Sequence, residues 1–227
     1  MTVVKSVLVT GASSGIGAAI ATRLLADGWQ VRGVARRVIA RDEPGWRGFE
    51  ADLSSIAGCD AVLAAVGPVD AFVHAAGFME TAALGGLDAD AGARMWRLHV
   101  AAAERLANGL VGGMVAGGRI VLVGSRTAQG AAGRSQYAAT KAALVAMARS
   151  WAIELAPRGV SVNVVAPAAT ETPMLADPAR GGTPPRLPPM GRYIQPAEVA
   201  AAVAFLLSPE AAMITGQTLT ICGGSSL

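Results

Sequence analysis

The sequence predicts a doubly wound α/β fold, in which helices cover both faces of a parallel sheet. Short β-branched runs alternate with stretches rich in alanine and leucine along the 227 residues. Most of these runs are almost continuously apolar, which is typical of parallel strands buried on both faces. Because chains of about 200 to 250 residues commonly form one α/β core, we expect a single domain over residues 1–227. The expected strands are residues 6–10, 29–35, 48–52, 70–76, 119–124, 159–167 and 218–223.

The segments between the strands carry helix signals, with one exception. After the first strand, apolar residues recur at helical spacing and a glycine stands where the helix should end. These residues are Ile16, Ile20, Leu24, Leu25 and Gly28. Residues 172–192 instead hold six of the twelve prolines, so they cannot form a regular helix or a central strand. We expect an irregular flap there, over a substrate.

Composition limits the functional classes. No apolar run approaches the roughly 18 residues that a membrane span requires, and the chain enters its first strand without a signal peptide, so we expect a soluble, cytoplasmic protein with no membrane partner. The net charge is +3, but the arginines are scattered and only 4% of the residues are aromatic, which argues against nucleic-acid binding. Cys59 and Cys222 match no metal-ligand spacing; we expect reduced thiols and no metal site.

A glycine-rich turn follows the first strand. In "VLVTGASSGIG", Gly11, Gly15 and Gly17 lie where the strand gives way to the helix. Glycine lets the backbone approach a pyrophosphate closely, and the free N–H groups of the helix N-terminus then meet its negative charge. The spacing differs from the G-x-G-x-x-G fingerprint. A tight turn without a ligand is the alternative interpretation.

A tyrosine and a lysine form the candidate proton-transfer site. Tyr137 is one of two tyrosines in the chain, and Lys141, one of two lysines, follows four residues later. On a helix the two side chains share one face. A phenol normally titrates near pH 10, but a nearby cation stabilises the phenolate and makes the phenol a usable acid and base. The alternative is an exposed polar pair on an amphipathic helix.

Four motifs in order carry a family resemblance. "TGASSGIG", "SQYAATK", "VNVVAP" and the segment that begins "GRYIQPAEV" resemble the small, soluble branch of the short-chain dehydrogenase/reductase family, and the likeness covers residues 4–224. The resemblance implies a Rossmann-type sheet of about seven strands, a nicotinamide cofactor and a homotetramer or dimer. Residues 94–116 and 137–155 are alanine-rich and are the expected contact surfaces between subunits.

The end of the second strand indicates which cofactor is used. An acid there would bind the ribose 2′-hydroxyl of NAD(H), whereas a cation would bind the 2′-phosphate of NADP(H). In "VRGVARR" the place of the acid is taken by Ala35, followed by Arg36 and Arg37. We therefore favour NADP(H) and keep NAD(H) as the alternative, because Ser14 stands where the family usually has a basic residue in the glycine turn. Solvated loop charges are the other interpretation of the two arginines.

The resemblance assigns the remaining catalytic roles. Ser125 would hold the substrate oxygen beside Tyr137, although it lies one residue closer to the tyrosine than the family pattern expects, where Gly124 stands. His99 replaces an asparagine that, in the family, holds a water for proton relay. An imidazole could hold this water, or His99 could be a packed histidine that contributes only shape. His74, in "HAAG", is expected to be structural.

The resemblance also defines the cofactor-binding set, which combines the glycine turn with residues at or after the strand ends. Its members are Gly11, Ser13, Ser14, Gly15, Ile16, Gly17, Arg36, Arg37, Asp52, Leu53, Ala75, Ala76, Gly77, Tyr137, Lys141, Pro167, Ala169 and Thr172. For Asp52, the expected adenine contact, a simple helix cap is the alternative.

Around the substrate, the sequence leaves two questions open. The apolar flap residues would either wall the pocket or pack on their own domain; they are Met174, Leu175, Leu187 and Met190. Arg126, Gln129 and Arg134 would be either solvated or in contact with an anionic group.

The leading hypothesis is an NADP(H)-dependent oxidoreductase that interconverts a ketone or aldehyde with a secondary alcohol, with Tyr137 as the acid and base. Its alternatives are an NAD-dependent alcohol dehydrogenase that works oxidatively, and a cofactor-binding protein of the same fold that has lost turnover.

Overall fold

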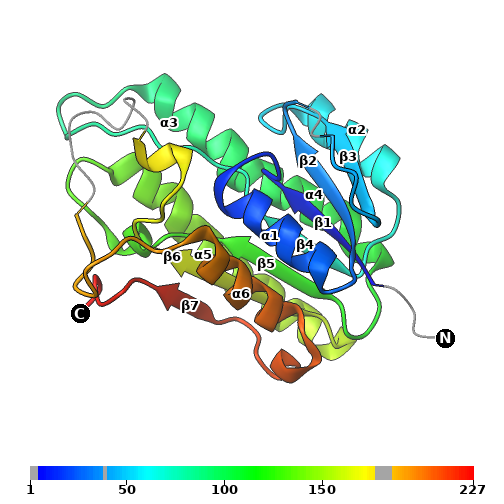
Figure 1. Ribbon diagram of the computed structural model, residues 1–227. Helices are drawn as coiled ribbons and strands as arrows, with labels where there is room; N and C mark the ends of the chain where they lie inside the picture. Colours follow the sequence, from blue (N-terminus) through cyan, green and yellow to red (C-terminus); the bar gives the residue numbers. More distant parts are fainter. Residues whose placement is uncertain (1–4, 38–39, 177–185) are drawn as a thin grey trace.

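The computed structural model describes residues 5–37, 40–176 and 186–227. Within these ranges the chain forms one seven-stranded parallel sheet in the order β3-β2-β1-β4-β5-β6-β7 (Figure 1). The strands are β1 (Ser6–Thr10), β2 (Gln30–Ala35), β3 (Trp46–Glu50), β4 (Ala71–His74), β5 (Arg119–Val123), β6 (Ser161–Pro167) and β7 (Thr218–Ile221). The chain runs outward from β1 to β3 on one side and from β4 to β7 on the other. A crevice therefore opens at the carboxyl ends of β1 and β4, where open α/β sheets bind their ligands.

The predicted α/β fold is confirmed, and every strand expected from the sequence is present with ends shifted by at most a few residues. The exception concerns burial. β3 was expected to be buried on both faces, but it is one of the two edge strands, and its residues are only partly covered or exposed. Edge position depends on strand order, which the local pattern of a strand does not contain.

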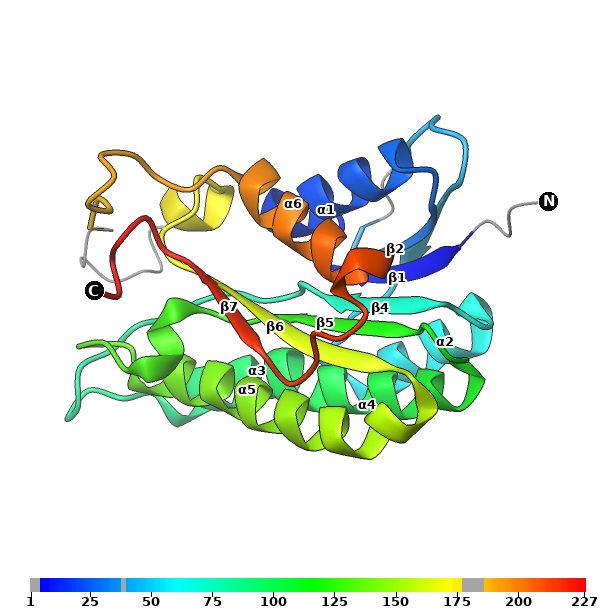
Figure 2. The same cartoon turned by 90° about the horizontal axis from the view of Figure 1, so that it is seen from below.

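Two helical layers enclose the sheet (Figure 2). Helices α1 and α6 cover one face, and α2, α4 and α5 cover the other. The helices are α1 (Gly15–Ala26), α2 (Ile56–Val66), α3 (Ala89–Trp96), α4 (Ala102–Leu110), α5 (Ser135–Leu155) and α6 (Pro196–Leu207). A single π-helical turn, Arg97–Ala101, joins α3 to α4.

Successive side chains of a strand point to opposite faces of the sheet, so each face has its own apolar core. In β1, Val7 and Val9 point to the layer of α1 and α6, whereas Leu8 points to the opposite layer. All three side chains are completely buried, and burial of an aliphatic side chain of this size contributes about 1.5 to 3 kcal/mol. The central strands are thus held from both faces, which fixes the position of their carboxyl ends.

The helix after β1 matches its prediction. Ile20 and Leu24 of α1 are buried against the sheet. Asp27 caps the helix, and Gly28 follows with φ +83°. This left-handed conformation favours glycine and ends the helix.

The proline-rich segment is irregular where it is described. A short 3₁₀ turn, Pro173–Ala176, begins it, and residues 177–185 lie outside the described residues. Its base is closed by a bridge between Thr170 and Ile194. Its function as a substrate flap stays a prediction.

Across the described ranges, every helix is too short or too polar to cross a membrane.

The close approach of the glycine turn to α1 yields a stability prediction. A Cβ at Gly17 would lie 2.2 Å from the carbonyl oxygen of Gly11, a backbone atom that cannot move aside. We expect Gly17→Ala to lower the free energy of unfolding by roughly 1 to 3 kcal/mol or more, measured by urea denaturation. Gly112→Ala is the matched control, since a Cβ there meets nothing within 4 Å. Equal effects of the two substitutions would contradict this account of the turn.

Candidate active site

A cleft of about 1290 Å³ runs along the carboxyl ends of the strands. It brings together nearly all the site residues expected from the sequence. The lining includes Gly11, Ser13, Ser14, Gly15, Ile16, Gly17, Arg36, Asp52, Leu53, Ala75, Ala76, Gly77, His99, Ser125, Tyr137, Lys141, Pro167, Ala169 and Thr172. The exception is Arg37, which is exposed and is not among the described residues that line the cleft.

The glycine turn fits an anionic group. Gly11 has φ +68°, and a Cβ there would lie 2.8 Å from the Cα of Ala76, so the turn needs glycine to pass this close to the loop after β4. Ser14 precedes α1 but its side chain makes no capping hydrogen bond. The first amide N–H groups of α1 therefore remain available at the cleft, an arrangement that suits a pyrophosphate.

Arg36 and Asp52 lie at the end of the cleft beside β2 and β3. Hydrogen bonds from the backbone N–H and the hydroxyl of Ser54 lower the pKa of the Asp52 carboxyl group, and the charge of Arg36 adds a smaller lowering effect. Only Oδ1 of Asp52 accepts these bonds. The N-cap of α2 is Ser55, whose side chain accepts from the N–H of Gly58, so Asp52 is not the cap of that helix.

Tyr137 and Lys141 lie one turn apart on α5, as the spacing predicted. The Nζ of Lys141 is buried, donates to the carbonyl oxygen of Val123 at 2.9 Å, and lies 5.7 Å from the centroid of the Tyr137 ring. Burial lowers the pKa of Lys141 to about 8. The ammonium is therefore mostly charged at neutral pH, and it lies close enough to influence the phenol.

Ser125 lies two residues beyond the end of β5 and lines the cleft. Its oxygen accepts the backbone N–H of Thr127 at 3.1 Å. This bond orients the side chain and leaves the hydroxyl proton for another acceptor. At the neighbouring Gly124, a Cβ would lie only 2.6 Å from the side chain of Val164. The geometry thus favours Ser125 over position 124 for a cleft hydroxyl.

Both ring nitrogens of His99 are occupied. The N–H of Phe78 donates to Nε2 at 3.1 Å, so the proton of the neutral ring resides on Nδ1. Nδ1 then donates to the hydroxyl of Thr140 at 2.8 Å, and Thr140 donates to the carbonyl oxygen of Tyr137. Burial, and after it the charge of Lys141, hold the pKa of His99 well below its usual value. No nitrogen remains to hold a relay water, so the structure favours the packed histidine over the proton relay.

His74 joins β1 and β4 to the π-helical turn. The hydroxyl of Thr10 accepts the N–H groups of Ala75 and Ala76, so its proton points to Nδ1 of His74 at 3.0 Å. Nε2 of His74 then donates to the carbonyl oxygen of Leu98 at 3.1 Å. Burial and the charge of Lys141 lower the pKa of His74 to about 3. His74 therefore has the structural surroundings expected from the sequence.

An apolar cluster surrounds Tyr137. Met79 and Met95 are buried against the tyrosine, and Phe78 and Met174 pack on the same cluster. The ring of His99 meets the ring of Tyr137 edge to face, with 5.7 Å between the centroids. Of the other flap residues, Leu175 and Leu187 line the cleft, whereas Met190 is exposed outside it.

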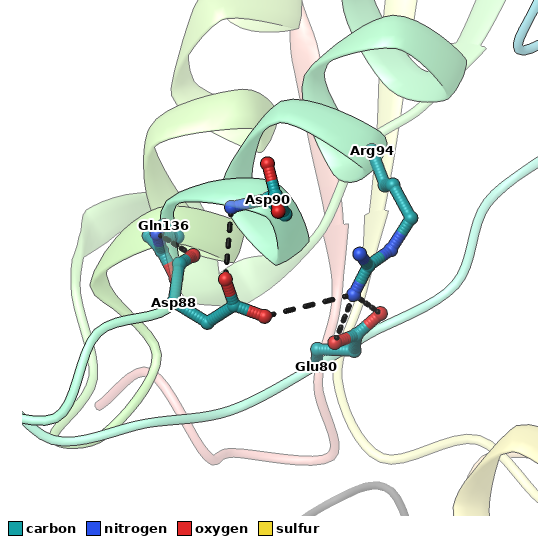
Figure 3. A network of polar contacts seen from close by, with 5 residues as sticks. All are labelled: Glu80, Asp88, Asp90, Arg94 and Gln136. Carbon is teal, nitrogen blue, oxygen red and sulfur yellow. Dashed lines mark hydrogen bonds and ion pairs between the residues drawn. The ribbon is translucent and has the colours of Figure 1, made fainter.

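Several site residues gave little signal in the sequence. Thr10 and Thr140 connect the histidines to the backbone, and a polar residue at the end of an otherwise apolar strand was the only sign of Thr10. Glu80 and Arg94 both line the cleft and form two hydrogen bonds with each other, at 3.1 and 3.0 Å (Figure 3). They come from an irregular segment and from α3, and no spacing rule connects them.

Fold and site define a nicotinamide-type oxidoreductase scaffold: a glycine turn at the β1–α1 junction facing a buried tyrosine and lysine. Residues 11–226 match the family described as Enoyl-(Acyl carrier protein) reductase. The chain belongs to the short-chain dehydrogenase/reductase family, as its motifs indicated.

Individual members of the family are similar to this chain over nearly their whole length. The 3-oxoacyl-(acyl-carrier-protein) reductase FabG of Vibrio cholerae is 38% identical over 236 residues, which cover 97% of this chain and 96% of that protein. Among solved structures, BdcA in complex with NADPH has 34% identity and a TM-score of 0.86, and the alignment covers 97% and 93% of the two chains. A blue fluorescent protein from a metagenomic library, also in complex with NADPH, has 31% identity and a TM-score of 0.86, with 98% of each chain covered.

The two buried histidines predict a pH dependence of stability. In the unfolded chain each histidine titrates near pH 6.5, whereas burial lowers the folded pKa of His74 to about 3, so the unfolded state binds more protons below about pH 6.5. The free energy of unfolding is therefore highest above that pH and falls as the pH is lowered. We expect His74→Gln to reduce this slope between about pH 6 and 5 by up to roughly 1.4 kcal/mol per pH unit, measured by urea denaturation.

His99→Gln, which removes the other histidine of the chain, should reduce the slope in the same direction. The carboxylates are the same in wild type and variant, so their contribution cancels in the comparison of the two slopes. An unchanged slope in both variants would show that the histidines are not held neutral in the folded protein.

Proposed function

We propose that this protein is an NADP(H)-dependent oxidoreductase that reduces a ketone or an aldehyde to the alcohol, with Tyr137 as the acid and base. The observation that carries the proposal is the convergence of Ser125, Tyr137 and Lys141 on the same cleft as the glycine turn and Arg36. The similarity to FabG and to two proteins in complex with NADPH supports it.

Several features of the cleft suit the cofactor. The uncapped N-terminus of α1 would bind the pyrophosphate, and Arg36 would bind the 2′-phosphate by parallel hydrogen bonds. Asp52 would contact the adenine through Oδ2, which has no hydrogen-bond partner among the described residues. The remaining donors of Lys141 would bind the ribose hydroxyls. Thr172 and Ala169 would lie beside the nicotinamide carboxamide.

The residues around the carbonyl have separate tasks. When bound, the reduced cofactor supplies the two electrons and the hydrogen that the carbonyl carbon receives. Ser125 would donate its free hydroxyl proton as a hydrogen bond to the carbonyl oxygen, and Tyr137 would transfer its own proton to that oxygen. The ammonium of Lys141, which Val123 holds in place, would stabilise the phenolate that remains. His99 would position Tyr137 through Thr140 and take no part in the proton transfer.

Substitution of Tyr137 tests its proposed role as the acid and base. We expect Tyr137→Phe to lower kcat for ketone reduction by about 10² to 10⁴ while the dissociation constant of NADPH, measured by fluorescence, stays within about threefold. Tyr193→Phe is the control, because Tyr193 lies outside the cleft lining. A panel of 3-oxoacyl thioesters, simple ketones and aldehydes supplies the substrates. Cofactor binding without any turnover, and without an effect of Tyr137→Phe, would favour the non-catalytic alternative.

The adjacent arginines test the cofactor preference. Arg36 lines the cleft and Arg37 does not, so the two form a matched pair. We expect Arg36→Asp to raise the KM for NADPH more than tenfold and to shift the preference in kcat/KM toward NADH, because the carboxylate repels the 2′-phosphate. Arg37→Asp should change both constants by less than about threefold. A wild-type preference for NADH, or equal effects at both positions, would contradict the assignment.

A further inference from the structure

The end of the cleft beside Ser125 and Tyr137 carries an excess of positive charge. Arg94, Arg126 and Arg134 line it, with Glu80 as the acidic residue on the same wall. Arg186 of the proline-rich segment also lines the cleft. Glu80 is bound by Arg94 through two hydrogen bonds (Figure 3), so its charge is balanced. The charges of Arg126 and Arg134 are not balanced in this way.

Backbone contacts place both arginines next to the catalytic groups. Arg126 directly follows Ser125 and begins a 3₁₀ helix, Arg126–Gln129. Arg134 precedes α5, one turn before Tyr137, and its main chain is fixed by a bridge to Ala82. Both side chains are half-buried.

Neither guanidinium forms a side-chain hydrogen bond or an ion pair with the described residues, and the Nε of Arg134 is buried without an acceptor. Some other arginines of the chain do pair with carboxylates, as Arg105 does with Asp60 and Arg192 with Glu198. A buried donor without a partner destabilises a folded protein, and each such group calls for an explanation. An acceptor on a bound ligand would explain the unpartnered Nε of Arg134.

We propose that Arg126 and Arg134 bind an anionic group of the substrate, a carboxylate or a phosphate, while the substrate carbonyl meets Ser125 and Tyr137. The inference rests on the proposed function. Two guanidinium groups suit an oxyanion because each offers parallel N–H donors. The site is separate from the cofactor phosphates, since Arg36 and the N-terminus of α1 follow β2 and β1, whereas Arg126 follows β5, beyond β4 in the sheet.

Matched pairs of ketones test the proposal. One pair is 4-oxopentanoate and its methyl ester, and the other is hydroxyacetone phosphate and hydroxyacetone; the first tests a carboxylate and the second a phosphate. We expect wild-type kcat/KM to favour the anion of at least one pair by roughly 10- to 100-fold. The double variant Arg126→Gln/Arg134→Gln should lose most of this preference.

Arg149→Gln is the control, because Arg149 is exposed on α5, the helix that Arg134 precedes, and lies outside the cleft lining; it should keep the full preference. Absence of a preference for the anion in both pairs, or its persistence in the double variant, would overturn the proposal while the reductase function stands.

A binding measurement separates this failure from failure of the proposed function. Isothermal titration calorimetry would compare 4-oxopentanoate with its methyl ester, and hydroxyacetone phosphate with hydroxyacetone, on the protein with and without NADP⁺. If wild-type protein reduces no ketone but binds an anion that the double variant does not bind, the anion site stands and the reductase function is rejected. If the anions bind no more tightly than the neutral compounds, or nothing binds, the anion site is rejected.

Discussion

A buried series of hydrogen bonds through two uncharged imidazoles holds together the end of the cleft that contains Tyr137. Thr10 at the end of β1 connects to His74 on β4, and His74 connects to the π-helical turn that contains His99. From there the series continues through Thr140 to the backbone of Tyr137. Each member is satisfied only if both rings are neutral, and burial ensures this. The ends of β1 and β4 and helix α5 are therefore fixed relative to one another.

Charge divides the cleft into regions with different tasks. Arg36 and Asp52 form one end, near β2 and β3. Lys141 is buried near the middle, where its Nζ donates to β5 and lies 5.7 Å from the centroid of the Tyr137 ring. Arg134 and its neighbours form the other end. Because these cations are separated along the sheet, a dinucleotide and an anionic substrate would not compete for the same groups.

Much of this arrangement could be predicted because it depends on local pattern. Buried parallel strands are recognisable as apolar runs, and the glycine turn and the Tyr137–Lys141 pair have spacings that define their geometry within one element. The same local patterns did not reveal which strands lie at the edges, nor that Arg36 lines the cleft while Arg37 is not part of its described lining. Which of two neighbouring residues after a strand lines the cleft depends on the path of the loop, and that path is set only by folding.

The sequence by itself determined the α/β class, the order of the elements and the placement of Tyr137 and Lys141 on one face of a helix, because these follow from periodicity and spacing along the chain. Only the tertiary structure showed that both ring nitrogens of His99 are taken, by Phe78 and Thr140, groups that lie 21 and 41 residues away. It also decided that Glu80 balances Arg94, whereas Arg134 has no counterion among the residues that the structure describes. Hydrogen bonds and charge pairs between distant segments depend on how the elements pack, and packing has no signature in any short stretch of sequence.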